Sequence, residues 1–254
     1  MLTTQFVPGA PTWLDLGAPD VKAAAAFYTG VFGWSFQSAG PQGGDYGFLQ
    51  LDGKTVAALG PLTEEGARPA WTTYFATADA DATAALVERH GGEVRAAPSD
   101  VFTKGRMAHF TDPAGAEFAV WQARDLGGLD LVTEPGSLGW VELHVQDAEE
   151  VLPFYQAVFG WRAQSVAMGP MTYRILSTGE SEDTSFGGLT ELMPDDRPHW
   201  APYFEVSDCD GTVAMAQQLG GTLVAPAESV EGVGRFATLD DPFGARFSVI
   251  TSTP

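Results

Sequence analysis

The chain has 254 residues, 44% of them hydrophobic, and a formal net charge of −20 at pH 7, which opposes binding to nucleic acids and anionic membranes and favours neutral or cationic ligands. It shows no signal peptide and no apolar run near the roughly 20 residues of a membrane span, so we expect a soluble cytoplasmic protein. The single cysteine, Cys209, excludes an intrachain disulfide and a cysteine-based zinc cluster.

The first half of the chain is predicted to form two successive strand–helix–strand segments. Residues alternate in character from Trp13 to Leu16, which indicates a strand, and Asp20 stands where the N-cap of a helix belongs. We expect this helix to end near Gly33. The later elements are strands at Tyr46–Leu51, Thr55–Leu59 and Thr72–Thr77, a helix from Asp79 to Gly91-Gly92, and two strands joined by the turn Asp112-Pro-Ala-Gly.

The same pattern returns, in the same order, in the second half. The repeated residues are Trp13, Phe27-Tyr28, Trp34, Trp71 and Asp112, which return as Trp140, Phe154-Tyr155, Trp161, Trp200 and Asp241. The expected elements are strands at Trp140–Val145, Met171–Ser177, Phe186–Thr190 and Pro202–Val206, helices after Asp147 and Asp208, and two strands around the Asp241 turn. We therefore predict one domain duplicated, with domains at 1–124 and 138–254 and an acidic, Gly-rich linker at 125–137.

This order of elements predicts an α+β fold. Each domain is expected to contain two βαβββ units that form a curved mixed sheet with helices on the outside. The opposite, concave face must then meet the partner unit or a ligand. Trp71 and Trp200 have the strand parity that places them under the helices. Arg106 and Arg235 lie on Gly-rich stretches that are either flexible edges over the cavity or plain turns.

The doubled pattern resembles the vicinal oxygen chelate superfamily, also called the glyoxalase/bleomycin-resistance/dioxygenase group. The resemblance is carried by the helix ending in Phe-Tyr-x-x-x-Phe-Gly-Trp and by the Asp-Pro-x-Gly hairpin, and it covers nearly the whole chain. It looks most similar to two-domain glyoxalase-like proteins of actinobacteria. The resemblance implies a fold that hosts lyases, isomerases, dioxygenases, thiol transferases and binding proteins, so it does not by itself specify a function.

The resemblance also implies a divalent metal held at the starts of strands one and five and on the last strand of each domain. By that pattern the positions in this chain are Trp13, Thr72 and Ala119 in the first copy and Trp140, Ala201 and Ser248 in the second. Tryptophan and alanine cannot coordinate a divalent ion, and a lone hydroxyl is a poor ligand. We therefore predict no metal site and no cofactor.

Strand parity then predicts which side chains line the concave face. If Trp140 faces the concavity, so do Glu142 and His144, which could form a catalytic acid–base pair. The alternative is that Glu142 pairs with Arg246 in a buried scaffold contact and His144 lies near a rim. The predicted ligand-binding residues are Trp13, Asp15, Tyr74, His109, Trp140, Tyr203 and Arg246.

Two functions remain open. The first is a metal-independent protein that binds an aromatic or partly apolar metabolite or drug, because aromatic walls with few polar groups suit flat ligands. The second is an enzyme of the lyase, isomerase, hydroxylase or dioxygenase type that uses Glu142 and His144, or a displaced metal. In either case the expected partner is a small molecule, and the protein is expected to be a monomer with pseudo-twofold domains or a homodimer.

Overall fold

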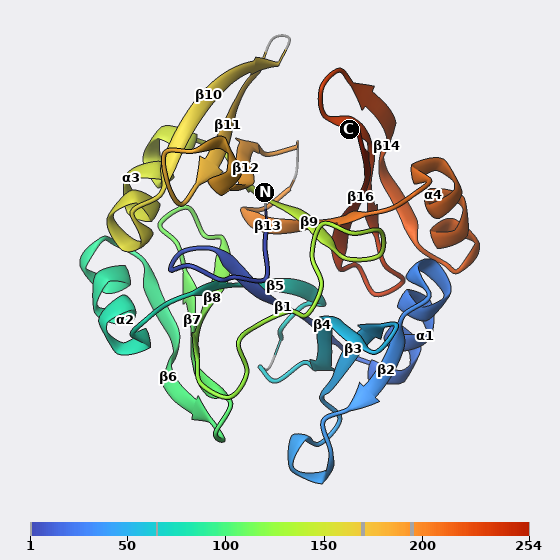
Figure 1. Ribbon diagram of the computed structural model, residues 1–254, viewed down its shortest axis with the longest axis horizontal. Coiled ribbons are helices and arrows are strands. Elements are labelled where there is room, and N and C mark those ends of the chain that lie inside the picture. The colour runs from blue at the N-terminus through green and yellow to red at the C-terminus, as the bar shows by residue number, and fades with distance from the viewer. Residues whose placement is uncertain (1, 65, 169–170, 194–195, 254) are drawn as a thin grey trace. The chain divides into compact units, whose positions relative to one another are not determined.

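The computed structural model describes residues 2–64, 66–168, 171–193 and 196–253 of the chain (Figure 1). Its strands form two similar eight-stranded mixed sheets, one from each sequence copy, which confirms the predicted duplicated α+β fold. The strands of the first copy are β1 (Pro11–Ala18), β2 (Ser35–Ser38), β3 (Gly47–Leu51), β4 (Lys54–Pro61), β5 (Ala70–Ala76), β6 (Glu93–Val101), β7 (Gly105–Thr111) and β8 (Glu117–Ala123). Those of the second are β9 (Leu138–Val145), β10 (Arg162–Met168), β11 (Met171–Ser177), β12 (Ser185–Glu191), β13 (His199–Glu205), β14 (Thr222–Val230), β15 (Gly234–Asp240) and β16 (Arg246–Ser252).

Each α-helix begins directly after an aspartate, as the sequence predicts. The four aspartate side chains accept a hydrogen bond from a backbone N–H in the first helical turn, which satisfies a donor that has no partner inside the helix. The helices with their caps are α1 (Val21–Phe32) after Asp20, α2 (Ala80–Arg89) after Asp79, α3 (Ala148–Phe159) after Asp147 and α4 (Cys209–Gln218) after Asp208. None of the described helices is long and apolar enough to cross a membrane.

The chain divides into two compact units, each built from parts of both sequence copies. Unit 1 contains residues 1–13, 72–128 and 140–201, and unit 2 contains residues 14–71, 129–139 and 202–254. In unit 1, α2 lies against β6 and β7 and beside α3 (Figure 1). In unit 2, α4 lies against β14 to β16 and beside α1. The domain boundaries predicted from the sequence follow the two copies, whereas each unit combines half of one copy with half of the other.

A buried bridge of three side chains joins the two copies inside each unit. In unit 1 the hydroxyl of Tyr155, on α3, donates to Asp112 Oδ2 at 2.9 Å and accepts from Trp200 Nε1 at 2.9 Å. In unit 2 Tyr28, Asp241 and Trp71 make the same bridge at 3.2 and 3.0 Å. The tryptophans therefore lie under the helices, as their parity predicts. Three of the repeated positions, namely the tyrosine, the tryptophan and the aspartate of each copy, are parts of this bridge.

Most of the segment predicted as a linker belongs to unit 2 and packs against the rest of that unit. Leu129 and Val132 are buried, and Asp130 accepts a hydrogen bond from Thr55 N at 2.9 Å. The carbonyl of Gly136 accepts a hydrogen bond from Trp34 Nε1 at 2.8 Å. Trp34 lies just after the end of α1, so this contact connects the end of the helix to the segment. These contacts hold the segment against the rest of unit 2.

Candidate functional site

A connected set of polar and aromatic side chains lies on one face of β9, inside unit 1. Val141, Leu143 and Val145 are fully buried on the other face of the strand, which agrees with the predicted alternation. We call the polar set, formed by Trp140, Glu142, His144, Tyr173 and His199, the β9 cluster. Glu142 and His144 expose only 9% and 14% of their side chains, so the polar groups of this pair are largely removed from water.

Hydrogen bonds connect the first four residues of the β9 cluster in a row. The indole Nε1 of Trp140 donates to the hydroxyl of Tyr173 at 2.9 Å, and that hydroxyl donates to Glu142 Oε1 at 2.8 Å. The other carboxylate oxygen of Glu142 lies 2.9 Å from His144 Nε2. The structure thus brings together the two residues predicted as an acid–base pair and adds Tyr173, which the sequence analysis did not identify.

Tyr173 reaches Glu142 because a glycine separates them. Tyr173 belongs to β11, and β12 lies between β11 and β9, where Gly188 pairs with Glu142 in the parallel register. A Cβ atom at position 188 would overlap the hydroxyl of Tyr173. The absence of a side chain at Gly188 is therefore what leaves space for the tyrosine to cross the intervening strand.

His199 covers one face of the His144 ring. The two imidazole rings are nearly parallel, with centroids 4.7 Å apart and planes 7° apart. His199 begins β13, and its Nδ1 lies 2.7 Å from the carbonyl of Arg197, which can only accept, so Nδ1 of His199 carries a proton. His144 is consequently held by the carboxylate of Glu142 at its edge and by a second ring on its face.

The first copy has part of this arrangement. Asp15 stands at the position of Glu142, and its carboxylate accepts from the hydroxyl of Tyr46 at 3.4 Å. Gly17 stands at the position of His144 and offers no side chain. A tyrosine–carboxylate contact is therefore common to both copies, which fits a scaffold role, whereas the imidazole is specific to the second copy.

The other residues predicted to bind a ligand have contacts of their own. Trp13 is buried on β1, with 5% of its surface exposed. The hydroxyl of Tyr74 lies 3.4 Å from His109 Nε2 in unit 1. In unit 2, Tyr203 packs edge-on against Phe236, and the Arg246 guanidinium donates to Asp240 at 2.9 Å. Their assignment to a ligand site stays a prediction.

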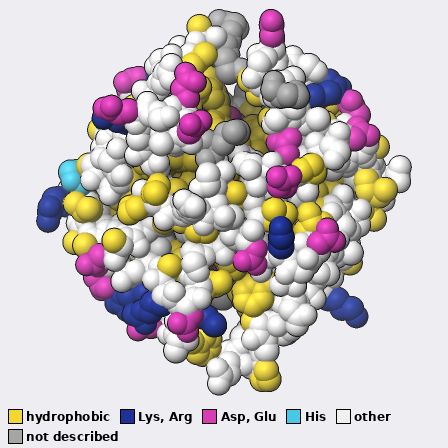
Figure 2. Space-filling model, in the orientation of Figure 1, with side chains coloured by type: hydrophobic (Ala, Val, Ile, Leu, Met, Phe, Trp, Pro, Cys, Tyr) yellow, Lys and Arg dark blue, Asp and Glu magenta, His cyan; other side chains and the backbone are white. Residues whose placement is uncertain are grey.

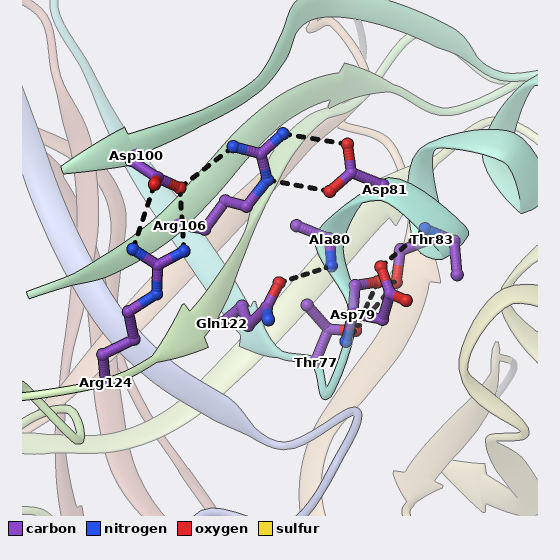
Figure 3. A network of polar contacts seen from close by, with 10 residues as sticks. Thr77, Asp79, Ala80, Asp81, Thr83, Asp100, Arg106, Gln122 and Arg124 are labelled. Atoms are coloured by element: carbon purple, nitrogen blue, oxygen red, sulfur yellow. Dashed lines mark hydrogen bonds and ion pairs between the residues drawn. The ribbon is translucent and has the colours of Figure 1, made fainter.

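Arg106 and Arg235 are anchored to helices. The guanidinium of Arg106 makes two hydrogen bonds to Asp81 of α2, at 2.8 and 2.9 Å, and a third to Asp100, which Arg124 also contacts (Figure 3). These arginines hold the pKa of the Asp81 and Asp100 carboxyl groups below their usual value. Arg235 contacts Asp210 of α4 in the same way, at 2.8 and 2.7 Å. The repetition in both copies indicates a scaffold contact between strand and helix.

Unit 1 also has two shallow hollows along the N-terminal segment. The larger, of about 390 Å³, is lined by Phe6, Pro8 and Trp121 among others, and the smaller, of about 220 Å³, by Leu2 and Phe186 among others. Neither lining includes a residue of the β9 cluster. On the visible face of the protein, acidic side chains are scattered among basic ones (Figure 2), so the negative net charge is not concentrated there in one patch.

Two family models match the chain in tandem. The model of the glyoxalase/bleomycin resistance protein/dioxygenase superfamily matches residues 11–120, and the model of a glyoxalase-like domain matches residues 140–250. The chain belongs to this superfamily. It is 44% identical to the anthracycline biosynthesis protein DnrV of Streptomyces peucetius, over 97% of this chain and 94% of that protein.

Solved structures of superfamily members share the fold. The 2,3-dioxygenase LapB from Pseudomonas sp. KL28 is similar with a TM-score of 0.66 at 13% identity, over 97% of this chain and 94% of that one. A Mn(II)-bound glyoxalase from Novosphingobium aromaticivorans is similar with a TM-score of 0.63 at 20% identity, over 96% and 83%. At these identities the likeness establishes the fold alone.

The metal that the superfamily implies does not fit the side chains at its expected positions. Trp13, Thr72 and Ala119 stand there in the first copy, and Trp140, Ala201 and Ser248 in the second. The Ser248 hydroxyl is already paired with the hydroxyl of Thr238 at 2.9 Å. Within the described ranges, no group of three or more His, Cys, Asp or Glu side chains is arranged to hold a metal ion. This donor set is unsuited to a divalent cation.

Proposed function

We propose that the protein binds a small aromatic or partly apolar molecule at the β9 cluster without using a metal ion. The observation that carries the proposal is the row of contacts from Trp140 through Tyr173 and Glu142 to His144. A tryptophan stands where the superfamily implies a metal ligand, and it is joined to fixed polar groups. Binding sites for small molecules combine such aromatic surfaces with a few oriented polar atoms.

Two further facts concern the chemistry of the ligand. The relative DnrV is named for anthracycline biosynthesis, and anthracyclines are planar polycyclic aromatic molecules that carry an amino sugar. A formal net charge of −20 attracts cationic ligands of this kind and repels anionic ones. The proposal places the aromatic part of the ligand against Trp140 and its polar groups near His144.

The test compares one variant in each copy. His144→Ala removes the imidazole, and we expect it to weaken binding of an anthracycline about tenfold, the equivalent of one hydrogen bond of about 1.4 kcal/mol. Gly17→Ala is the matched control, because its new Cβ would lie 3.1 Å from the end of the Leu62 side chain and should affect packing alone. Affinity is measured by quenching of tryptophan fluorescence, and folding by thermal melting. Unchanged affinity in His144→Ala, with a clear loss of stability, would show that His144 has a structural role and does not bind the ligand.

A second candidate function is acid–base catalysis on the bound molecule. It is favoured by the 2.9 Å contact between Glu142 Oε2 and His144 Nε2, because a carboxylate that orients an imidazole is the arrangement found in general bases. If this function holds, mass spectrometry of a ligand incubated with the protein shows a product that His144→Ala and Glu142→Gln both fail to form. A ligand recovered unchanged from the wild-type protein would leave binding as the function.

A further inference from the structure

We infer that Nδ1 of His144 is the atom that selects the ligand, and that it accepts a hydrogen bond from an aromatic hydroxyl group. This inference rests on the proposed function, because it specifies which ligands the β9 cluster would take. It predicts that phenol-type molecules bind better than the same ring systems without a donor. Both the atom and its role follow from the directions of the hydrogen bonds in the cluster.

The directions of the hydrogen bonds in the β9 cluster follow from Trp140, at one end of the row. The indole N–H of Trp140 can only donate, so the oxygen of Tyr173 accepts from it. The single hydroxyl proton of Tyr173 then goes to Glu142 Oε1. As a carboxylate, Glu142 can only accept, so the remaining contact requires a proton on Nε2 of His144. In the neutral imidazole, the other nitrogen, Nδ1, is then a lone-pair acceptor.

This acceptor is buried and has no hydrogen-bond partner among the described residues. Nearly all buried polar atoms in folded proteins have a partner, and leaving one without a partner costs free energy. A donor on a bound ligand would remove that cost, and an apolar ligand at the same place would not. The site should therefore prefer ligands that carry a donor group. Enzymes select substrates in the same way when a substrate without the required hydrogen-bonding group leaves a buried polar group of the site unpaired.

The neighbouring groups also fix the direction of approach. The ring of His199 lies parallel to that of His144, with centroids 4.7 Å apart, and covers one of its faces. The carboxylate of Glu142 holds the opposite edge of the ring at Nε2. Because the lone pair of Nδ1 lies in the ring plane, the ligand hydroxyl must approach along that plane. A flat aromatic molecule with a hydroxyl group on its edge satisfies this requirement.

The first copy provides an internal comparison. Its tyrosine–carboxylate contact, between Tyr46 and Asp15, resembles that of Tyr173 and Glu142. Gly17 stands where the second copy has His144, so no imidazole is offered there. Recognition of a hydroxyl by this mechanism therefore belongs to the second copy alone.

The experiment uses two probes that differ by a methyl group in place of the hydroxyl proton. 2-Naphthol carries a hydroxyl group, whereas 2-methoxynaphthalene has the same rings and an ether that cannot donate. We expect the wild-type protein to bind 2-naphthol about tenfold more tightly than the ether, as one hydrogen bond at a buried acceptor implies. In His144→Ala the ratio of the two affinities should fall to about one, while Gly17→Ala should keep the wild-type ratio. The ratio isolates the interaction from any general change in binding.

A second variant covers the case in which His144→Ala folds poorly, as shown by thermal melting. His144→Asn keeps an amide oxygen close to the position of Nδ1 and should retain part of the preference for 2-naphthol. Equal binding of the two probes to the wild-type protein would overturn the inference and leave the proposed function standing. Tighter binding of 2-naphthoate than of 2-naphthol would also overturn it, because Nδ1 would then be a donor. If neither naphthalene probe nor an anthracycline binds, the proposed function itself is wrong and the inference falls with it.

Discussion

Replacing Tyr155 by phenylalanine removes one oxygen atom from the bridge that joins the two sequence copies in unit 1. That oxygen lies 2.9 Å from Asp112 Oδ2 and 2.9 Å from Trp200 Nε1. All three side chains are buried, so water cannot replace the lost contacts easily. The substitution therefore leaves one buried acceptor and one buried donor without their partner, and it adds no new atoms that could clash.

The magnitude follows from the number of groups left unsatisfied. Each buried polar group without a partner costs about 1–3 kcal/mol, so the two together should lower the free energy of unfolding by about 2–6 kcal/mol. Asp112 keeps hydrogen bonds from Ala114 N and Ala116 N to its other oxygen, which favours the lower part of this range. In a protein of this size, 1 kcal/mol corresponds to about 2–4 °C, so the melting temperature should fall by roughly 5–15 °C.

The matched variant is Tyr28→Phe, in the equivalent bridge of unit 2. Its hydroxyl is 3.2 Å from Asp241 Oδ2 and 3.0 Å from Trp71 Nε1, so its contacts are longer and its loss should be the smaller of the two. Because the two bridges share no residue, the effects on stability should add in the double variant within about 0.5 kcal/mol. Urea unfolding of the wild type, both single variants and the double variant measures these quantities.

The effect of Tyr155→Phe should depend on pH through Asp112. Burial raises the pKa of Asp112 above its ordinary value of 3.8, while the Tyr155 hydroxyl lowers it by donating to the ionised form. The stability that the raised pKa contributes is complete below pH 3.8 and is lost as the pH rises through the raised pKa. The penalty of Tyr155→Phe should thus be largest near neutral pH, where Asp112 is ionised, and shrink on acidification. A penalty that stays constant down to about pH 3, or one below about 0.5 kcal/mol, would refute this account of the bridge.

Two further predictions concern metal content and the thiol. The expected metal-ligand positions hold residues such as Trp140 and Ala201, which cannot coordinate a divalent ion. Elemental analysis should therefore find no stoichiometric divalent ion, and EDTA should leave the melting temperature unchanged. Finding about one zinc, iron, manganese or nickel per domain would overturn this assignment. Burial raises the pKa of Cys209 to about 11. The native protein should therefore react slowly with a thiol reagent at about pH 8, and the unfolded protein should react rapidly. Equal rates in the two states would show that the thiol is accessible in the native protein.

Local features of the fold could be predicted because short sequence signals determine them. Asp79 and Asp208 cap their helices through contacts within three residues, and Gly33 ends α1 at a positive φ of 74°. β2 was not located from the sequence because its four residues, Ser35–Ser38, are mostly exposed and show no apolar alternation. The predicted βαβββ unit contains three strands after this helix, as the structure does, although the sequence analysis located only two of them.

The pairing of halves into units could not be predicted, because it depends on contacts between distant residues. Tyr155 and Asp112 come from different sequence copies, and nothing in either local pattern indicates that they meet. Tyr173 was missed for a related reason, since its contact with Glu142 crosses an intervening strand. The signal that could have found it is Gly188, whose missing side chain leaves a gap in β12. A glycine inside a predicted strand is a sign of close approach by another group.

The residues of the Tyr155 bridge in unit 1 are distinct from those of the β9 cluster. Trp200 and His199 are neighbours on β13 but point to opposite faces of the strand. Trp200 donates to Tyr155 on α3, whereas the ring of His199 stacks on His144. The same alternation on β9 puts Val141 and Leu143 in the core and Glu142 and His144 in the cluster. Because the stabilising bridge uses the helix-facing side, changes on the other face should alter the proposed ligand binding without removing the contacts that join the halves. Substitutions at His144 therefore test the proposed ligand binding separately from folding, whereas those at Tyr155 measure folding alone.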